Sequence, residues 1–177
     1  MNKCELLNRV PKAGDIAKIQ SYFSNNSHFN VVGHLEAGVR DLVIALNCAG
    51  FPTRYSCEGH PQESSMSGRS EVPIVEVVTV VKFRNPLLDL LFQNLNSEAD
   101  VSRCLRDVRT KLETLFENCF DGDKTSIVLH APCHRVGVVR LEGDKSKGSA
   151  AEMHPQYLAD IEKFNIYIRN LLNSGES

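Results

Sequence analysis

The sequence predicts an α+β protein, a two-layer sandwich with a mostly antiparallel sheet and helices on one face. Two observations lead to this fold class. Stretches with apolar residues at helical spacing alternate with short runs rich in β-branched residues. The order of these elements suits two layers and resembles a ferredoxin-like core with additions. No linker or internal repeat divides the chain, so residues 1–177 are expected to form a single domain.

The first half of the chain contains the most regular helical pattern. It covers residues 36–47, where Val39, Leu42, Val43 and Leu46 share one face and Gly50 follows as a C-terminal cap. Weaker patterns predict a helix over 11–23 and a strand over 28–32. Strands are predicted over 52–57 and, from a valine-rich run, over 72–83.

The second half begins with two predicted helices. Leucines follow Pro86 in the first, over 86–95, and the second covers 97–120. Two short strands are expected over 126–130 and 135–141, followed by a polar loop over 142–149. A helix over 150–172 closes the chain, with a candidate break at His154-Pro155.

Composition narrows the class of protein. The formal net charge is -2 and the pI about 6.3, which gives no electrostatic footprint for nucleic acid, so nucleic acid is not an expected partner. No apolar run is long enough for a membrane span, and no signal peptide is recognisable. We therefore expect a cytoplasmic protein whose six cysteines are reduced.

Residues 53–60 read Thr-Arg-Tyr-Ser-Cys-Glu-Gly-His and place three reactive side chains in one turn after a predicted strand. A turn that only reverses the chain needs Gly, Asn, Asp or Pro. The octet therefore marks a candidate site, with Cys57, Glu58 and His60 as its catalytic residues.

A second group of potential metal ligands, His130, Cys133 and His134, lies at the end of another predicted strand. If the two strands are neighbours, three or four ligands drawn from Cys57, His60 and this second group could converge on one zinc ion, which takes tetrahedral thiolate and imidazole donors. Glu58 would then transfer protons to and from a metal-bound water. The alternative is that the second group is an ordinary surface loop.

Without a metal, Cys57 could instead act as a nucleophile, activated by a nearby imidazole such as that of His60. Arg69, in a Ser/Gly loop, could bind an anionic substrate, although a loop arginine is more often simply solvated. The expected partner is a small-molecule or anionic substrate.

The helix followed by Thr53-x-x-Ser56-Cys57-x-Gly59-His60 resembles a group of uncharacterised bacterial and phage proteins that share this turn. A more distant resemblance is to the wybutosine-synthesis tRNA methyltransferases, in which Ser and Arg stand at the positions of Glu58 and His60. The second resemblance implies S-adenosylmethionine-dependent tRNA modification. Both resemblances cover about 20 residues, those from Leu42 to His60.

The sequence therefore leads to three hypotheses about function. The first is a zinc-assisted hydrolase centred on Cys57 and His60. The second is a protein related to the tRNA-modifying enzymes, and the third is a non-catalytic binding module in which the octet is only a rigid turn.

Overall fold

The structure is a computed structural model that describes residues 35–62, 69–80, 105–121, 124–133 and 137–174, with the single residues 21, 99 and 102. In this part of the chain, three helices and four strands occur. They are α2 (Ala37–Cys48), β1 (Thr53–Cys57), β2 (Ile74–Val78), α6 (Val108–Phe120), β3 (Ile127–His130), β4 (Val138–Gly143) and α7 (Ala150–Ser174).

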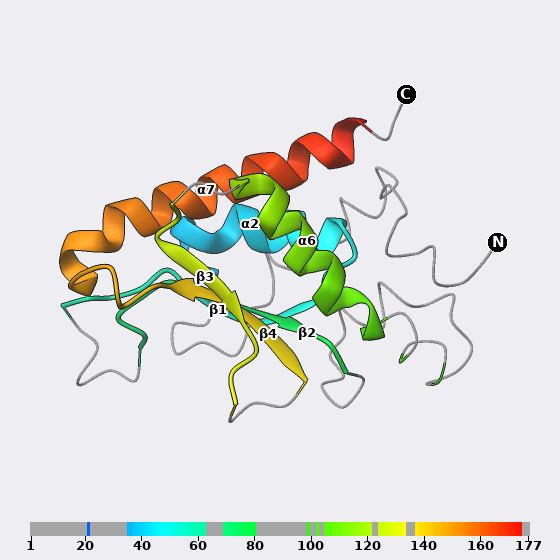
Figure 1. Cartoon of the computed structure of the whole chain (residues 1–177), viewed down its shortest axis with the longest axis horizontal. Helices are drawn as coiled ribbons and strands as arrows, with labels where there is room; N and C mark the ends of the chain where they lie inside the picture. Colours follow the sequence, from blue (N-terminus) through cyan, green and yellow to red (C-terminus); the bar gives the residue numbers. More distant parts are fainter. Residues whose placement is uncertain are drawn as a thin grey trace.

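The strands form one antiparallel sheet in the order β1-β2-β4-β3, and the helices lie together on one side of it (Figure 1). The two-layer α+β class is thus confirmed. Strands β2 and β3 are connected in sequence through α6 and lie on either side of β4, which is the split β-α-β arrangement found in ferredoxin-like cores. Here β1 pairs with β2 and β3 pairs with β4, with α6 between the two pairs in sequence.

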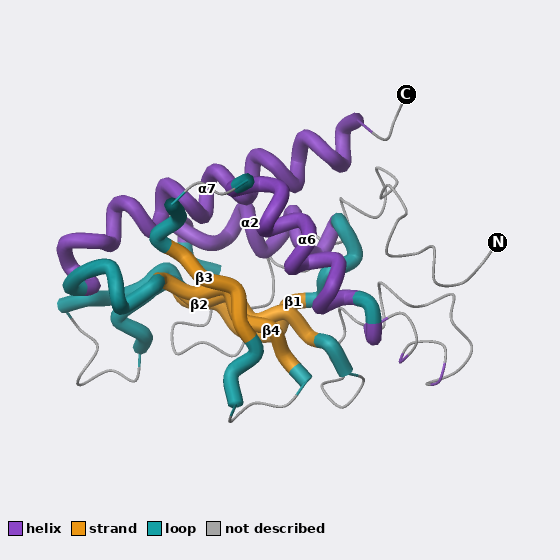
Figure 2. Tube along the Cα trace, viewed as in Figure 1, coloured by secondary structure: helices purple, strands orange, loops and turns teal. Residues whose placement is uncertain are grey.

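The core lies between the sheet and the helices (Figure 2). Alternate residues of the two central strands point into it, with Val75 opposite Leu141 and Val77 opposite Val139. They pack against one face of α7, which contributes Tyr157, Ile161, Phe164 and Ile168, and against the predicted apolar face of α2. Burial of each such side chain contributes about 1.5–3 kcal/mol.

The predicted helix over 36–47 and strand over 52–57 are confirmed as α2 and β1. Strand β2, from Ile74 to Val78, is shorter than the strand predicted over 72–83. It ends where its pairing partner β4 begins, with Val78 opposite Val138. The polar loop begins later than expected, since β4 continues to Gly143. The helix predicted over 97–120 is confirmed from Val108 to Phe120.

The candidate break at His154-Pro155 does not occur, and α7 continues through Pro155. Proline removes one backbone donor, but the carbonyl left without it belongs to Ala151, which is exposed and can bond to water. The helices predicted over 11–23 (apart from residue 21) and 86–95, and the strand over 28–32, lie outside the described residues.

Among the described residues, no helix is both long enough and apolar enough to cross a membrane.

Candidate metal centre

The connection between α2 and β1 determines which residues meet at the candidate site. The Asn47 side chain donates to Val43 O and to Thr53 Oγ1, and accepts from the Thr53 backbone N–H. This buried side chain therefore fixes the start of β1 against the end of α2. Gly50, with φ of 86°, allows the chain to reverse between them, as the capping pattern predicts.

The two elements also match in length. Helix α2 has 12 residues and spans about 18 Å, and β1 has 5 residues and spans about 17 Å. Because the chain reverses between them, the start of α2 returns to the end of β1. Glu36, immediately before α2, thereby meets Cys57 and His60.

Glu36, Cys57 and His60 form a compact group of potential metal ligands. One oxygen, the sulfur and one ring nitrogen lie within 4.8 Å of one another. Glu36 and Cys57 are buried, at 6% and 3% exposure, whereas the His60 side chain keeps 15%. The structure thus contains a candidate Glu/Cys/His metal site with its more accessible side at His60.

The Glu36 carboxylate is at the centre of this group. Its Oε1 lies 2.8 Å from His60 Nε2, and its Oε2 accepts the Glu58 backbone N–H at 2.7 Å. The Cys57 thiol also hydrogen-bonds to this carboxylate. Glu36 immediately precedes the first turn of α2, and the partial positive charge at a helix start favours a negative charge nearby.

Glu58 occupies a structural position. Its Oε2 accepts the Gly38 backbone N–H at 2.8 Å, one of the N–H groups at the start of α2 that lack partners within the helix. Glu58 therefore caps α2 from another part of the chain. Its carboxylate is not one of the grouped ligands, and its predicted role in proton transfer remains a prediction.

Gly59 gives the ligand-bearing turn its shape. Its φ is +88°, and a Cβ at this position would lie 2.8 Å from the backbone of both Val72 and Pro73. Only glycine fits such a close approach. The His60 backbone N–H then donates to Ser70 O at 2.7 Å, which holds the turn against the loop before β2.

The environment of Cys57 keeps its thiol protonated. Burial is the main cause that raises its pKa, and the neighbouring Glu36 carboxylate raises it further. Backbone hydrogen bonds with Gly59 and Ser70 oppose this shift without reversing it. A raised pKa is the opposite of what a nucleophilic cysteine requires, and a metal ion bound at Cys57 would have to displace the same proton.

The second predicted group lies elsewhere. Strands β1 and β3 are at opposite edges of the sheet and antiparallel to each other, so their C-terminal ends lie at opposite ends. His130 Nε2 is 2.9 Å from Glu142 Oε1, in a geometry that makes no hydrogen bond, and Cys133 is exposed. The structure therefore does not bring His130 and Cys133 to Cys57 and His60. His134 lies outside the described residues.

Glu36 is the candidate ligand that the sequence prediction missed. Ser, Thr, Asp and Asn are preferred immediately before a helix, and glutamate is not. Glu36 occupies that position without a capping hydrogen bond from its own side chain. A glutamate at an N-cap, one helix and one strand before a Cys/His turn, was the available signal.

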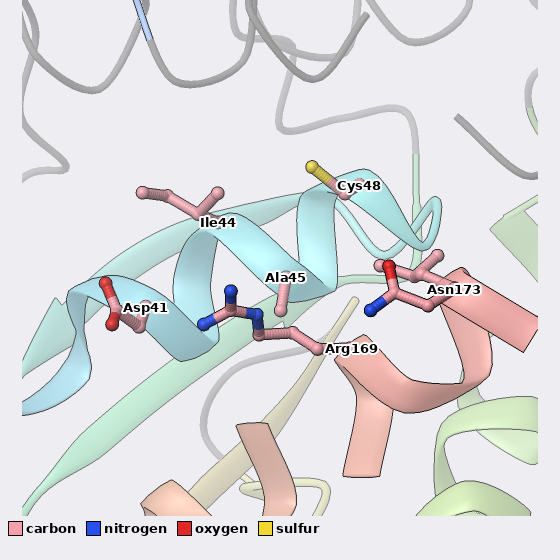
Figure 3. A pocket seen from close by; sticks show the side chains of 7 residues that line it. Asp41, Ile44, Ala45, Cys48, Arg169 and Asn173 are labelled. Carbon is pink, nitrogen blue, oxygen red and sulfur yellow. The ribbon is translucent and has the colours of Figure 1, made fainter. Parts of the chain in front are cut away.

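A groove elsewhere on the surface is chemically less suited to catalysis (Figure 3). It has a volume of about 390 Å³, lies between α2 and α7, and contains none of the three candidate ligands. Asp41, Arg169 and Asn173 line it beside apolar side chains. Among the described residues that line it, Cys48 carries a thiol, and burial raises the pKa of this thiol to about 11, which leaves it unreactive near neutral pH.

Comparisons with protein-family models, with curated proteins and with solved structures gave no match. The resemblance of residues 42–60 to the wybutosine-synthesis enzymes therefore remains a prediction.

Proposed function

We propose that this protein binds a zinc ion through Glu36, Cys57 and His60 and uses it for metal-assisted hydrolysis. The observation that carries the proposal is the convergence of these three side chains, with potential ligand atoms within 4.8 Å of one another. They come from two segments of the chain that the fold brings together.

The donor set supports zinc over a harder ion. Calcium and magnesium favour oxygen ligands, whereas zinc accepts thiolate, imidazole and carboxylate together. A thiolate and a carboxylate also neutralise the two positive charges of the ion. In a group as buried as Glu36 and Cys57, this neutralisation lowers the cost of removing the charges from water.

The number of ligands supports a catalytic rather than a structural ion. Structural zinc is normally held by four protein ligands, and catalytic zinc by three with one position left for water or substrate. A bound zinc ion supplies an activated water at neutral pH. The partly exposed His60 side chain indicates the side from which a small substrate would approach.

The test is zinc content and activity in matched variants. Protein purified without chelator or affinity metal should contain about one zinc per chain. Cys57→Ser should lose it, and Cys133→Ser, which changes an exposed cysteine, should keep it. Equal zinc content in both variants, or none in the wild type after zinc is supplied, would contradict the site.

Hydrolysis needs its own measurement. Zinc-loaded wild type and Cys133→Ser should hydrolyse a nitrophenyl ester or a bis-nitrophenyl phosphate, and zinc-treated Cys57→Ser should not. Zinc binding with no hydrolysis of either class would leave a metal-binding protein and remove the hydrolase assignment.

A further inference from the structure

We infer that His154 is a positioning residue for the proposed zinc site, because it holds the backbone that joins two of the three ligands. His154 lies near the start of α7, far from the candidate ligands in sequence. Its Nε2 is 2.9 Å from Glu58 O and 3.1 Å from Gly59 O. Both partners are carbonyl oxygens, which only accept, so this nitrogen carries the proton and donates to both.

The two carbonyl groups belong to the residues between Cys57 and His60. Gly59 has no side chain to restrict its backbone, and it adopts a positive φ of 88°. The contact between His60 N and Ser70 O fixes one end of this segment. His154 fixes the two peptide groups in the middle, and therefore the separation of the Cys57 and His60 ligand atoms.

The same face of α7 also reaches the helix that follows the third ligand. Leu158 is one turn after His154, and a Cβ built on Gly38 would lie only 2.9 Å from Leu158 Cδ2. Gly38 lies at the start of α2, two residues after Glu36. Two side chains of α7 thus contact the ligand-bearing turn and the start of α2, which aligns these segments with each other.

This inference rests on the proposed zinc site and adds a role for α7 in tuning its affinity. Residues that orient metal ligands without touching the metal typically change affinity about 10–100-fold when replaced. We expect an effect of this size when the proton donor at position 154 is removed.

The experiment compares two substitutions by cobalt titration, since Co²⁺ reports its coordination through visible absorption. His154→Leu removes the donor, and His154→Gln keeps a side-chain N–H. We expect His154→Leu to weaken Co²⁺ and Zn²⁺ binding about 10–100-fold and to alter the cobalt spectrum. His154→Gln should retain near wild-type affinity and spectrum, as should the control His130→Leu at the far edge of the sheet.

The possible outcomes distinguish a failure of this inference about His154 from a failure of the proposed zinc site. If the wild type binds neither ion, the zinc site fails and the inference with it. If the wild type binds both and His154→Leu matches it in affinity and spectrum, only the inference fails. Equal losses in His154→Leu and His154→Gln would also overturn it, because donation by the side chain would then not be the cause.

A measurement on the wild-type protein requires no substitution, and it tests the role of His154 even if His154→Leu does not fold. Nitrogen-15 NMR should identify His154 as protonated at Nε2, and this N–H signal should shift when zinc is added. A proton located on Nδ1 alone would contradict the inference. An Nε2–H signal that does not shift on addition of zinc, while the Cys57 and His60 signals do shift, would also contradict it.

Discussion

The two edges of the sheet carry similar residues in different surroundings. At the β1 edge, Cys57 ends the strand, His60 follows it, and both meet Glu36 in a largely buried group. At the β3 edge, Cys133 is exposed, and the His130 side chain, 40% exposed, lies beside Glu142 on the neighbouring strand. Proximity in sequence is thus common to both groups. The first group differs in its burial and in having a third candidate ligand, Glu36, from a distant segment of the chain.

The difference arises from what precedes each strand. Strand β1 follows a helix of matching length, and the Asn47–Thr53 hydrogen bonds hold the two elements together, so the start of the helix returns to the site. Strand β3 follows α6, and the His130 side chain at its end lies beside Glu142 of the neighbouring strand. Glu142, which contacts His130, also accepts from Arg140.

The largest expected difference between the edges comes from replacing one carboxylate at each. Glu36→Gln keeps the shape of the side chain but removes the charge, and we expect zinc affinity to fall more than about 100-fold, beyond the usual effect of an outer residue. Glu142→Gln should change it less than about threefold. Competition titration with a zinc chelator measures both. Equal affinities in the two variants would show that Glu36 is not a ligand.

A smaller difference is expected in the reaction of the two cysteines with iodoacetamide. Cys57 is 3% exposed with a raised pKa, whereas Cys133 is exposed. If modification of Cys57 requires a local opening that costs about 2 kcal/mol, Cys133 should react about 30-fold faster near neutral pH. Mass spectrometry of peptides gives both rates, and zinc should slow only the reaction at Cys57. Comparable rates would mean that the β1 edge is open in solution.

The smallest expected effect is the dependence of zinc affinity on pH. Because the pKa of Cys57 is raised, the thiol keeps its proton at neutral pH, and zinc must displace that proton. Affinity should therefore rise with pH, about tenfold per unit for one released proton, up to the pKa of the thiol. Calorimetry in buffers of different ionisation enthalpy counts the proton. The slope should persist in Cys133→Ser, and an affinity independent of pH would exclude Cys57 as the ligand.

Local features of the fold were predictable from the sequence. The apolar spacing in α2, the glycine cap at Gly50 and the β-branched runs each determine a short element through interactions between nearby residues. The strand order was not predictable, because it depends on which pairs of strands bury most surface together. The predicted five-residue metal site depended on that order, and it required β1 and β3 to be neighbours.

The sequence predicted the part of the candidate site that depends on residues close together in the chain, and missed the part that depends on long-range packing. Cys57 and His60 are three residues apart, so the turn itself brings them together. Glu36 lies 22 residues before Glu58, whose N–H it accepts, and only the packing of α2 against β1 places it there. Glu58 adjoins Cys57 in sequence and its carboxylate accepts from a backbone N–H at the start of α2, while its role in proton transfer stays a prediction.

X-ray absorption spectroscopy of the zinc-loaded protein tests the central claim most directly, because it identifies the atoms bound to the metal. We predict one sulfur at about 2.3 Å and nitrogen or oxygen ligands at about 2.0–2.2 Å, with the sulfur absent in Cys57→Ser. Two sulfurs would indicate that Cys57 and Cys133 share the ion, as the sequence alone suggested. A shell with no sulfur would contradict the site at Glu36, Cys57 and His60.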